Sequence, residues 1–158
     1  MRAISIVLAV FLAALPVAAQ EVSRIAAHGA WGVFKDGTGA DQLCWVAATA
    51  ELGELPLGGD TLPPPEILIL YTPSNAQLSL ELRGGATPAG GEITIARERF
   101  PLFFENGWGW LSRRGTDSNV RALMETKNTA YLRVGEAGYS VVLNGFAPAI
   151  AQAEQLCR

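Results

Sequence analysis

The middle of the chain is a series of short apolar stretches that alternate with polar residues and are interrupted by Gly and Pro. Leu78, Leu80 and Leu82, for example, occupy every second position of one such stretch. A period of two predicts strands with one buried face. No helical stretch of about 10–15 residues separates these strands, as a parallel α/β sheet would require. We therefore expect a mainly β fold, an antiparallel β-sandwich or a barrel-like domain.

Strands are predicted wherever an apolar stretch is bounded by turn residues. They cover residues 31–35, 42–49, 66–71, 76–82, 93–95 and 100–104, followed by a closing hairpin of residues 131–134 and 139–143. Residues 66–71 are apolar on both faces and predict a strand that is covered on both sides. Residues 55–65 include three consecutive prolines, which lack amide donors, and predict a loop.

Helical spacing appears only toward the C-terminal end. A short helix is expected, with Asp117 or Ser118 as its N-terminal cap and apolar residues at i, i+3 and i+4. A second helix is expected near the C-terminus, with Asn144 near its cap and Pro148 in its first turn. Its apolar stripe comprises Phe146, Ala149, Ile150, Ala153 and Leu156, and predicts that the helix packs on the sheet.

The first 19 residues have the three parts of an export signal. Arg2 is followed by an apolar run, by Pro16 and by the small residues Val17 and Ala19 at the positions that a signal peptidase reads. The apolar run is shorter than the roughly 20 residues that span a bilayer, which disfavours a membrane anchor. We expect residues 1–19 to be removed, the mature protein to start at Gln20, and the protein to act in the periplasm or outside the cell.

Residues 20–158 are then expected to form a single β-rich domain. The whole chain has twelve Lys and Arg against fifteen Asp and Glu, and Arg2 falls in the signal. A mildly acidic chain whose basic residues are not clustered does not suit nucleic-acid phosphates. Its glycines match no nucleotide-binding pattern. We expect no nucleic-acid partner, no cofactor and no membrane-spanning segment after signal cleavage.

Cys44 and Cys157 are the only two cysteines of the chain. In an oxidising compartment an even number of cysteines predicts a disulfide, and each lies on the predicted inward face of its own element. Two separately buried thiols or a redox pair are the alternatives, although redox pairs are usually closely spaced. Two Cys and one His cannot supply the usual four ligands of a structural zinc ion.

Two titratable residues were considered for catalysis. His28 is the only histidine and falls near the predicted mature N-terminus, where a mobile, solvated side chain is expected. Glu105 is flanked by Phe103, Phe104 and a tryptophan pair, and aromatic neighbours that desolvate a carboxylate can make it a general acid. Glycoside hydrolysis usually needs a second carboxylate, and none has a comparable setting.

Trp108 and Trp110 are separated by one glycine, so in an extended segment both indoles project from the same face while the glycines leave the other face bare. Packing in the core is one interpretation. The alternative is an aromatic platform for a sugar ring or a protein partner, with Glu105 beside it.

Several short motifs together resemble the invasion-associated locus B family of exported alphaproteobacterial proteins. They are residues 30–34 (AWGVF), 44–47 (CWVA), 104–110 (FENGWGW) and 143–149 (LNGFAPA), with Cys157. The resemblance implies a β-rich domain with an early and a late cysteine, and an envelope role that is named for host-cell invasion in pathogens. It implies no enzymatic activity. Family members carry a polar segment before the final strand, whereas residues 134–139 form a tight turn here, which weakens the transfer of an invasion role.

The sequence thus favours a non-enzymatic exported envelope protein that binds a protein or an envelope component. A glycan-binding module that uses Trp108 and Trp110 is the first alternative. A glycan hydrolase that uses Glu105 is the second.

Overall fold

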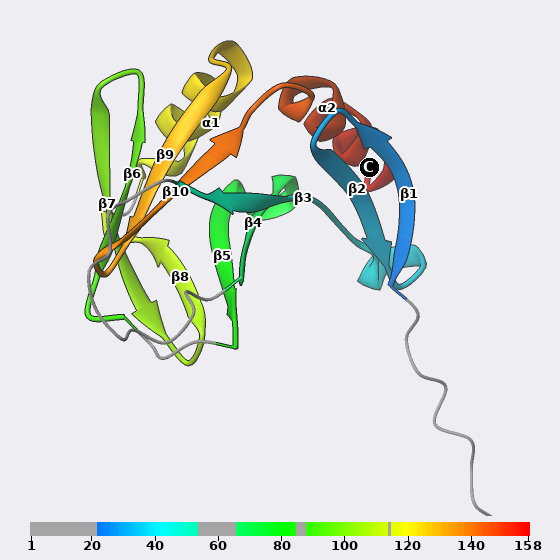
Figure 1. Cartoon of the computed structure of the whole chain (residues 1–158). Coiled ribbons are helices and arrows are strands. Elements are labelled where there is room, and N and C mark those ends of the chain that lie inside the picture. Colours follow the sequence, from blue (N-terminus) through cyan, green and yellow to red (C-terminus); the bar gives the residue numbers. More distant parts are fainter. Residues whose placement is uncertain (1–21, 54–65, 85–87, 114) are drawn as a thin grey trace, which may run out of the picture.

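The computed structural model describes residues 22–53, 66–84, 88–113 and 115–158 (Figure 1). The predicted signal at residues 1–19 and the predicted loop at residues 55–65 lie outside the described residues. The ten strands are β1 (Ser23–His28), β2 (Trp31–Asp36), β3 (Leu43–Leu52), β4 (Glu66–Thr72), β5 (Gln77–Arg83), β6 (Gly91–Ile95), β7 (Glu98–Glu105), β8 (Trp108–Leu111), β9 (Thr129–Val134) and β10 (Ala137–Val142). The two α-helices are α1 (Asp117–Thr126) and α2 (Phe146–Leu156).

Eight of the strands form a closed antiparallel barrel. Their order is β3-β10-β9-β6-β7-β8-β5-β4, and pairing of β4 with β3 closes the ring. The remaining two strands, β1 and β2, extend the sheet beyond β3 as a hairpin. The predicted fold class, a mainly β barrel-like domain with a short helix and a C-terminal helix packed on the sheet, is confirmed.

β3 belongs to both parts of this sheet. Along one edge it pairs first with β2, with Val46 opposite Val33, and near its end with β10, with Leu52 opposite Tyr139. Along the other edge it pairs with β4, with Val46 opposite Tyr71. β3 therefore links the barrel to the hairpin sheet of β1, β2 and β3.

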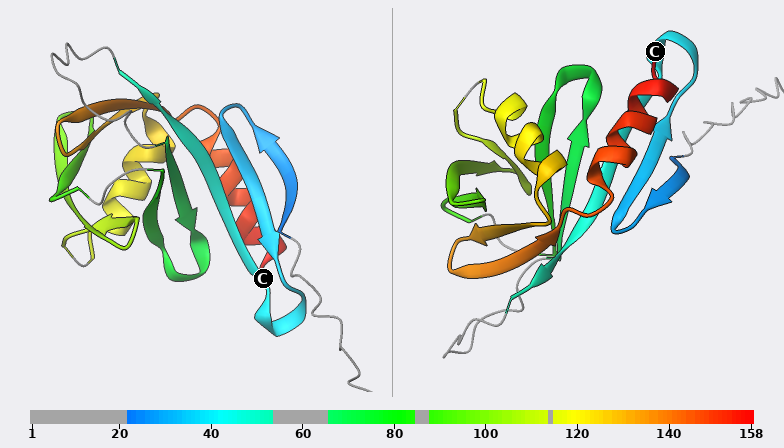
Figure 2. Two further views of the ribbon diagram at one scale, coloured as in Figure 1. Left: turned by 60° about the horizontal axis from the view of Figure 1, so that its bottom comes forward. Right: turned by 90° about the horizontal axis from the view of Figure 1, so that it is seen from above.

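The barrel interior is filled by the inward residues of the alternating strands. Leu78, Leu80 and Leu82 of β5 are buried as predicted, and so are Ile67 and Ile69 of β4. The outward leucines of β4 are only half-buried, so β4 is fully covered on one face, not on both. α1 lies within the ring of strands when the barrel is viewed along its length (Figure 2), and its Val120 and Met124 side chains are buried.

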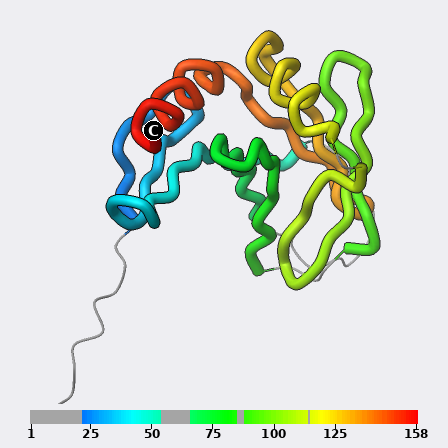
Figure 3. The backbone as a smooth tube through the Cα atoms, turned by 180° about the vertical axis from the view of Figure 1, so that it is seen from behind, coloured from blue at the N-terminus to red at the C-terminus, as the bar shows by residue number. Residues whose placement is uncertain are grey.

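α2 covers the hairpin sheet, as Figure 3 shows from behind (red over blue). Its predicted apolar stripe faces the sheet, with Phe146, Ala149, Ile150 and Ala153 buried and Leu156 packed at their edge. The Phe146 ring lies edge-on to Trp31, with 4.9 Å between centroids. Aromatic pairs of this kind favour edge-to-face packing.

A disulfide joins Cys44 of β3 to Cys157 at the end of α2, as the sequence predicted. The Cys44 side chain is 1 % exposed, so the bond is covered on its β3 side. The Gln42 amide group donates to the Leu156 carbonyl oxygen beside it. The C-terminal helix is thereby held to the hairpin sheet.

Two local predictions were wrong. Residues 23–28 form β1 instead of a mobile start, because they find an antiparallel partner in β2. Asp117 does not cap its own helix, since its Oδ1 accepts a hydrogen bond from the Leu78 backbone N–H at 2.9 Å. Asn144 lies next to the cap of α2, as predicted, and the capping residue itself is Gly145, which has a φ of 98° and where a side chain would collide with the His28 carbonyl oxygen.

Candidate functional site

The outer face of β5, β8 and β7 carries the aromatic residues that the sequence singled out. Trp108 pairs with Glu81 of β5 on one side and with Glu105 of β7 on the other. One pair further along β8, Trp110 lies between Ser79 and Phe103. Since alternate residues of a strand point to opposite faces, these side chains share the outside of the barrel.

Core packing of the two tryptophans is therefore wrong. Trp108 is 37 % exposed and Trp110 is half-buried on the outer face. On the inner face, Gly109 leaves space that the Phe104 ring fills, since a Cβ at Gly109 would lie 2.5 Å from Phe104 Cε1. The same ring also covers Gly91 on the other side of β7. The face that the glycines leave bare is thus occupied by Phe104, and the indoles stay outside.

Trp110 and Phe103 form a continuous aromatic wall. Their ring centroids are 5.4 Å apart and the ring planes are tilted by 31°. Phe103 is 46 % exposed. Because two large aromatic side chains lie in contact at the surface, the wall is a candidate for ligand contact.

A groove of about 420 Å³ runs along this wall. Phe103 and Trp110 line it together with the buried Leu78 and Leu111 and with three polar residues, Gln77, Glu105 and Asp117. A few polar groups set around an apolar surface are typical of ligand sites. The hydrogen bond from Leu78 N–H to Asp117 fixes the position of that carboxylate at the start of α1.

The groove is acidic. Among the described residues that line it, Glu105 and Asp117 are the only charged ones, and none is Lys or Arg. The neighbouring Glu81 is paired with Arg83, whose Nε lies 3.1 Å from Glu81 Oε1. Among the described residues, no ion pair involves Glu105.

The structure brings together only some of the residues predicted for function. Trp110 and Glu105 line the same groove, whereas Trp108 stands beside it on the outer face. Glu105 is exposed, so the desolvated carboxylate that a general acid would require is not found. His28 lies elsewhere, at the end of β1, where its Nε2 is 2.6 Å from Gln152 Oε1 of α2.

Sequence reasoning missed three lining residues. Phe103 could have been placed from its alternation with Glu105 along one strand. Gln77 and Asp117 are separated from the tryptophans in the chain and reach the groove only because β5 pairs with β8 and α1 begins beside Leu78. No local signal in the sequence marks either of them.

The other features of the described residues are less specific. A hollow of about 580 Å³ lies beside Lys35, Asp36 and Asp41 and has no aromatic lining. No group of three or more His, Cys, Asp or Glu in the described part of the chain could hold a metal ion. Neither described helix has the length and apolar character needed to cross a bilayer.

The fold and the groove together define a closed antiparallel β-barrel with an aromatic, acidic ligand surface on its outer wall. Comparisons of the chain with protein-family models, with curated proteins and with solved structures found no match. The argument for function therefore rests on the site itself.

Proposed function

We propose that this protein is a non-enzymatic, exported envelope protein that binds a protein or another envelope component through the groove beside Trp110. The observation that carries this proposal is the aromatic wall of Phe103 and Trp110, which lines a surface groove together with the acidic residues Glu105 and Asp117. Exposed aromatic side chains are common anchors in binding surfaces. The signal-like N-terminus and the Cys44–Cys157 disulfide both suit an oxidising compartment.

Binding to envelope material tests the proposed surface. Purified protein is incubated with native envelope fractions, and retention of wild type is compared with that of Trp110→Ala. The control is Tyr131→Ala on β9, which removes another large exposed aromatic side chain, away from the groove. We expect Trp110→Ala to lose retention and Tyr131→Ala to keep it. Equal retention of all three proteins would contradict the proposal.

Export is tested separately by intact-mass measurement of the protein recovered from the periplasm and the medium. The expected mass is that of residues 20–158. A mass that retains residues 1–19 would make that segment an anchor and move the protein to a membrane.

Glycan binding is the second candidate. It is favoured by the Gln77 amide beside the Trp110 ring, since sugars stack on indoles and form hydrogen bonds with amide and carboxylate groups. Hydrolysis has less support, because Glu105 is exposed and the other carboxylate of the groove, Asp117, is held by the Leu78 N–H. Turnover of an envelope glycan that is lost in Glu105→Gln would reverse this order.

A further inference from the structure

We infer that the groove receives a Lys or Arg side chain from an extended basic segment of a partner protein. This inference rests on the proposed binding role and specifies its ligand. Three features of the site support it: the charge of the groove, the aromatic wall, and the spacing of Trp108 and Trp110 along β8.

The charge of the groove selects the sign of the ligand. Glu105 and Asp117 contribute two carboxylates, and none of the described residues that line the groove is basic. The neighbouring Arg83 is already paired with Glu81. Phosphate groups of lipids and carboxylate groups of acidic glycans would be repelled by such a site, whereas a cation would be attracted.

The aromatic wall favours the same ligand. Trp110 and Phe103, whose rings lie in contact, line the groove together with Glu105. A guanidinium or ammonium group is attracted to the face of an aromatic ring, most strongly to tryptophan. The same group can donate charge-assisted hydrogen bonds to a carboxylate. Both contacts are available to one Lys or Arg side chain here.

The spacing along β8 indicates an extended segment. Trp110 lies beside Phe103, and Trp108 lies two residues away between Glu81 and Glu105. Residues i and i+2 of a strand are about 6.8 Å apart, and the same distance separates alternate side chains of an extended peptide. A groove of about 420 Å³ accommodates one side chain rather than a folded element. A basic-x-basic sequence would therefore place one cation at Trp110 and the next at Trp108.

The test uses a blocked peptide, Gly-Arg-Gly-Arg-Gly, and the same peptide with citrulline in place of both arginines. Citrulline keeps the size and planarity of arginine and removes its charge. Binding is followed by NMR through the indole N–H signals of the four tryptophans. We expect the signals of Trp108 and Trp110 to shift and those of Trp31, which is buried, and Trp45, which stacks on Phe34, to stay unchanged.

The charge dependence is tested with matched variants. Glu105→Gln is expected to weaken binding of the arginine peptide about fivefold. An exposed ion pair contributes up to about 1 kcal/mol, which corresponds to about a fivefold change in affinity. The control, Glu136→Gln, removes the same charge from an exposed position in the β9–β10 turn and should leave the affinity unchanged. Raising the salt concentration to about 0.5 M should weaken binding of the wild type, since screening acts on exposed charges.

Each outcome has one meaning. Equal shifts with the citrulline peptide, or equal affinity of wild type and Glu105→Gln, would overturn the inference. If neutral chitotetraose shifts Trp108 and Trp110 while the arginine peptide does not, the inference fails but a binding role for the groove stands, with a glycan as ligand. If Trp110→Ala retains envelope binding as well, the proposed function fails independently.

Discussion

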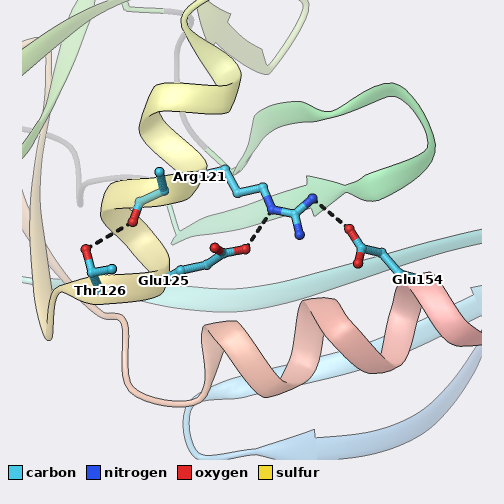
Figure 4. Close-up of polar contacts among 5 residues, drawn as sticks. Arg121, Glu125, Thr126 and Glu154 are labelled. Atoms are coloured by element: carbon cyan, nitrogen blue, oxygen red, sulfur yellow. Dashed lines mark hydrogen bonds and ion pairs between the residues drawn. The ribbon is translucent and has the colours of Figure 1, made fainter.

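Arg121 of α1 and Glu154 of α2 form an ion pair, with 2.6 Å between Nη1 and Oε1 (Figure 4). The same guanidinium donates from Nε to Glu125, one turn further along α1, at 2.7 Å. Burial lowers the pKa of Arg121, but the hydrogen bonds that its guanidinium donates to both carboxylates outweigh this effect and hold the pKa above its ordinary value. Arg121 thus links the helix of the barrel to the helix of the hairpin sheet.

We expect Glu154→Gln to destabilise the protein by about 0.5–1 kcal/mol, because the pair is partly exposed and screened by solvent. The measurement is urea unfolding of Glu154→Gln, Arg121→Gln and the double variant, from which the coupling energy follows. A high salt concentration should reduce this coupling energy. A coupling energy near zero at low salt would show that the contact between the two helices contributes nothing.

We expect the free energy of unfolding to depend on alkaline pH through the Tyr71 hydroxyl. Burial raises the pKa of Tyr71, and Arg121, which lies over its ring at 5.8 Å from the centroid, only partly offsets this. A raised folded pKa means that the stability is fully present below the unfolded pKa of about 10 and is lost as pH rises further. We therefore expect the free energy of unfolding to fall above about pH 10. Burial raises the pKa of Tyr139 as well, so the two residues share this loss.

The Tyr71→Phe variant separates the contribution of Tyr71 to the alkaline loss of stability from that of Tyr139. The Tyr71 hydroxyl is buried and no well-formed hydrogen bond satisfies it among the described residues, although the Arg121 guanidinium interacts with it, so its removal should change stability at pH 8 by less than about 1 kcal/mol. The variant should also lose less stability between pH 8 and pH 11 than wild type does. Identical pH profiles in urea unfolding would mean that Tyr71 does not govern the alkaline loss.

The docking of α2 is tested by two substitutions in adjacent positions. Ile150 is 2 % exposed against the sheet, whereas Ala151 points to solvent. Ile150→Asp would bury an unpaired charge and should cost more than about 3 kcal/mol, and Ala151→Asp should cost less than about 1 kcal/mol. Thermal unfolding measures both. Equal melting temperatures would show that the helix is not docked in this register.

Reduction of the disulfide should lower the melting temperature markedly. Cys44 and Cys157 close a loop with a sequence separation of 113 residues. The chain-entropy model assigns such a loop on the order of 4–5 kcal/mol, an upper value because residual unfolded structure reduces it. Limited proteolysis of the reduced protein should cut α2 before the barrel strands. Two free thiols in the denatured, unreduced protein would contradict the bond itself.

Gly109 should be intolerant of a side chain, because the Phe104 ring occupies the space beside it. Gly109→Ala is expected to destabilise the protein by about 1–3 kcal/mol as the ring is displaced. Gly90 provides the control, since the nearest atom to a Cβ there is the Leu102 carbonyl oxygen at 4.0 Å. Chemical denaturation of both alanine variants measures the difference. If Gly90→Ala proves as costly, crowding by Phe104 is not the cause.

The sequence predicted the barrel strands well because their residues alternate strictly. Leu78, Leu80 and Leu82 face inward in the structure, and the stripe of α2 is buried as expected. β1 was missed because its residues lack this signal, and all of them except Ala26 and His28 are exposed. Its strand conformation comes from pairing with β2, a tertiary contact that local pattern does not encode.

The candidate site was predicted only in part, because it too depends on tertiary contacts that the local sequence does not encode. Glu105, Trp108 and Trp110 stood out by composition, but composition could not decide which face of β8 is buried. That choice depends on Phe104, whose ring fills the inner face across Gly109. The sequence predicted Asp117 as a possible helix cap. Its actual partner, the Leu78 N–H, lies 39 residues away in the chain, so no local pattern indicates this hydrogen bond.

The position of β3 determines how the molecule can come apart. Its first half is a strand of the hairpin sheet and its second half closes the barrel, so loss of this strand opens both at once. The disulfide joins Cys157 to Cys44 of β3, and an ion pair joins Glu154 of α2 to Arg121 of α1. Detachment of α2 from the sheet would therefore disturb β3 or α1. Barrel and hairpin are therefore expected to melt in one cooperative transition, so that a single unfolding free energy describes them both.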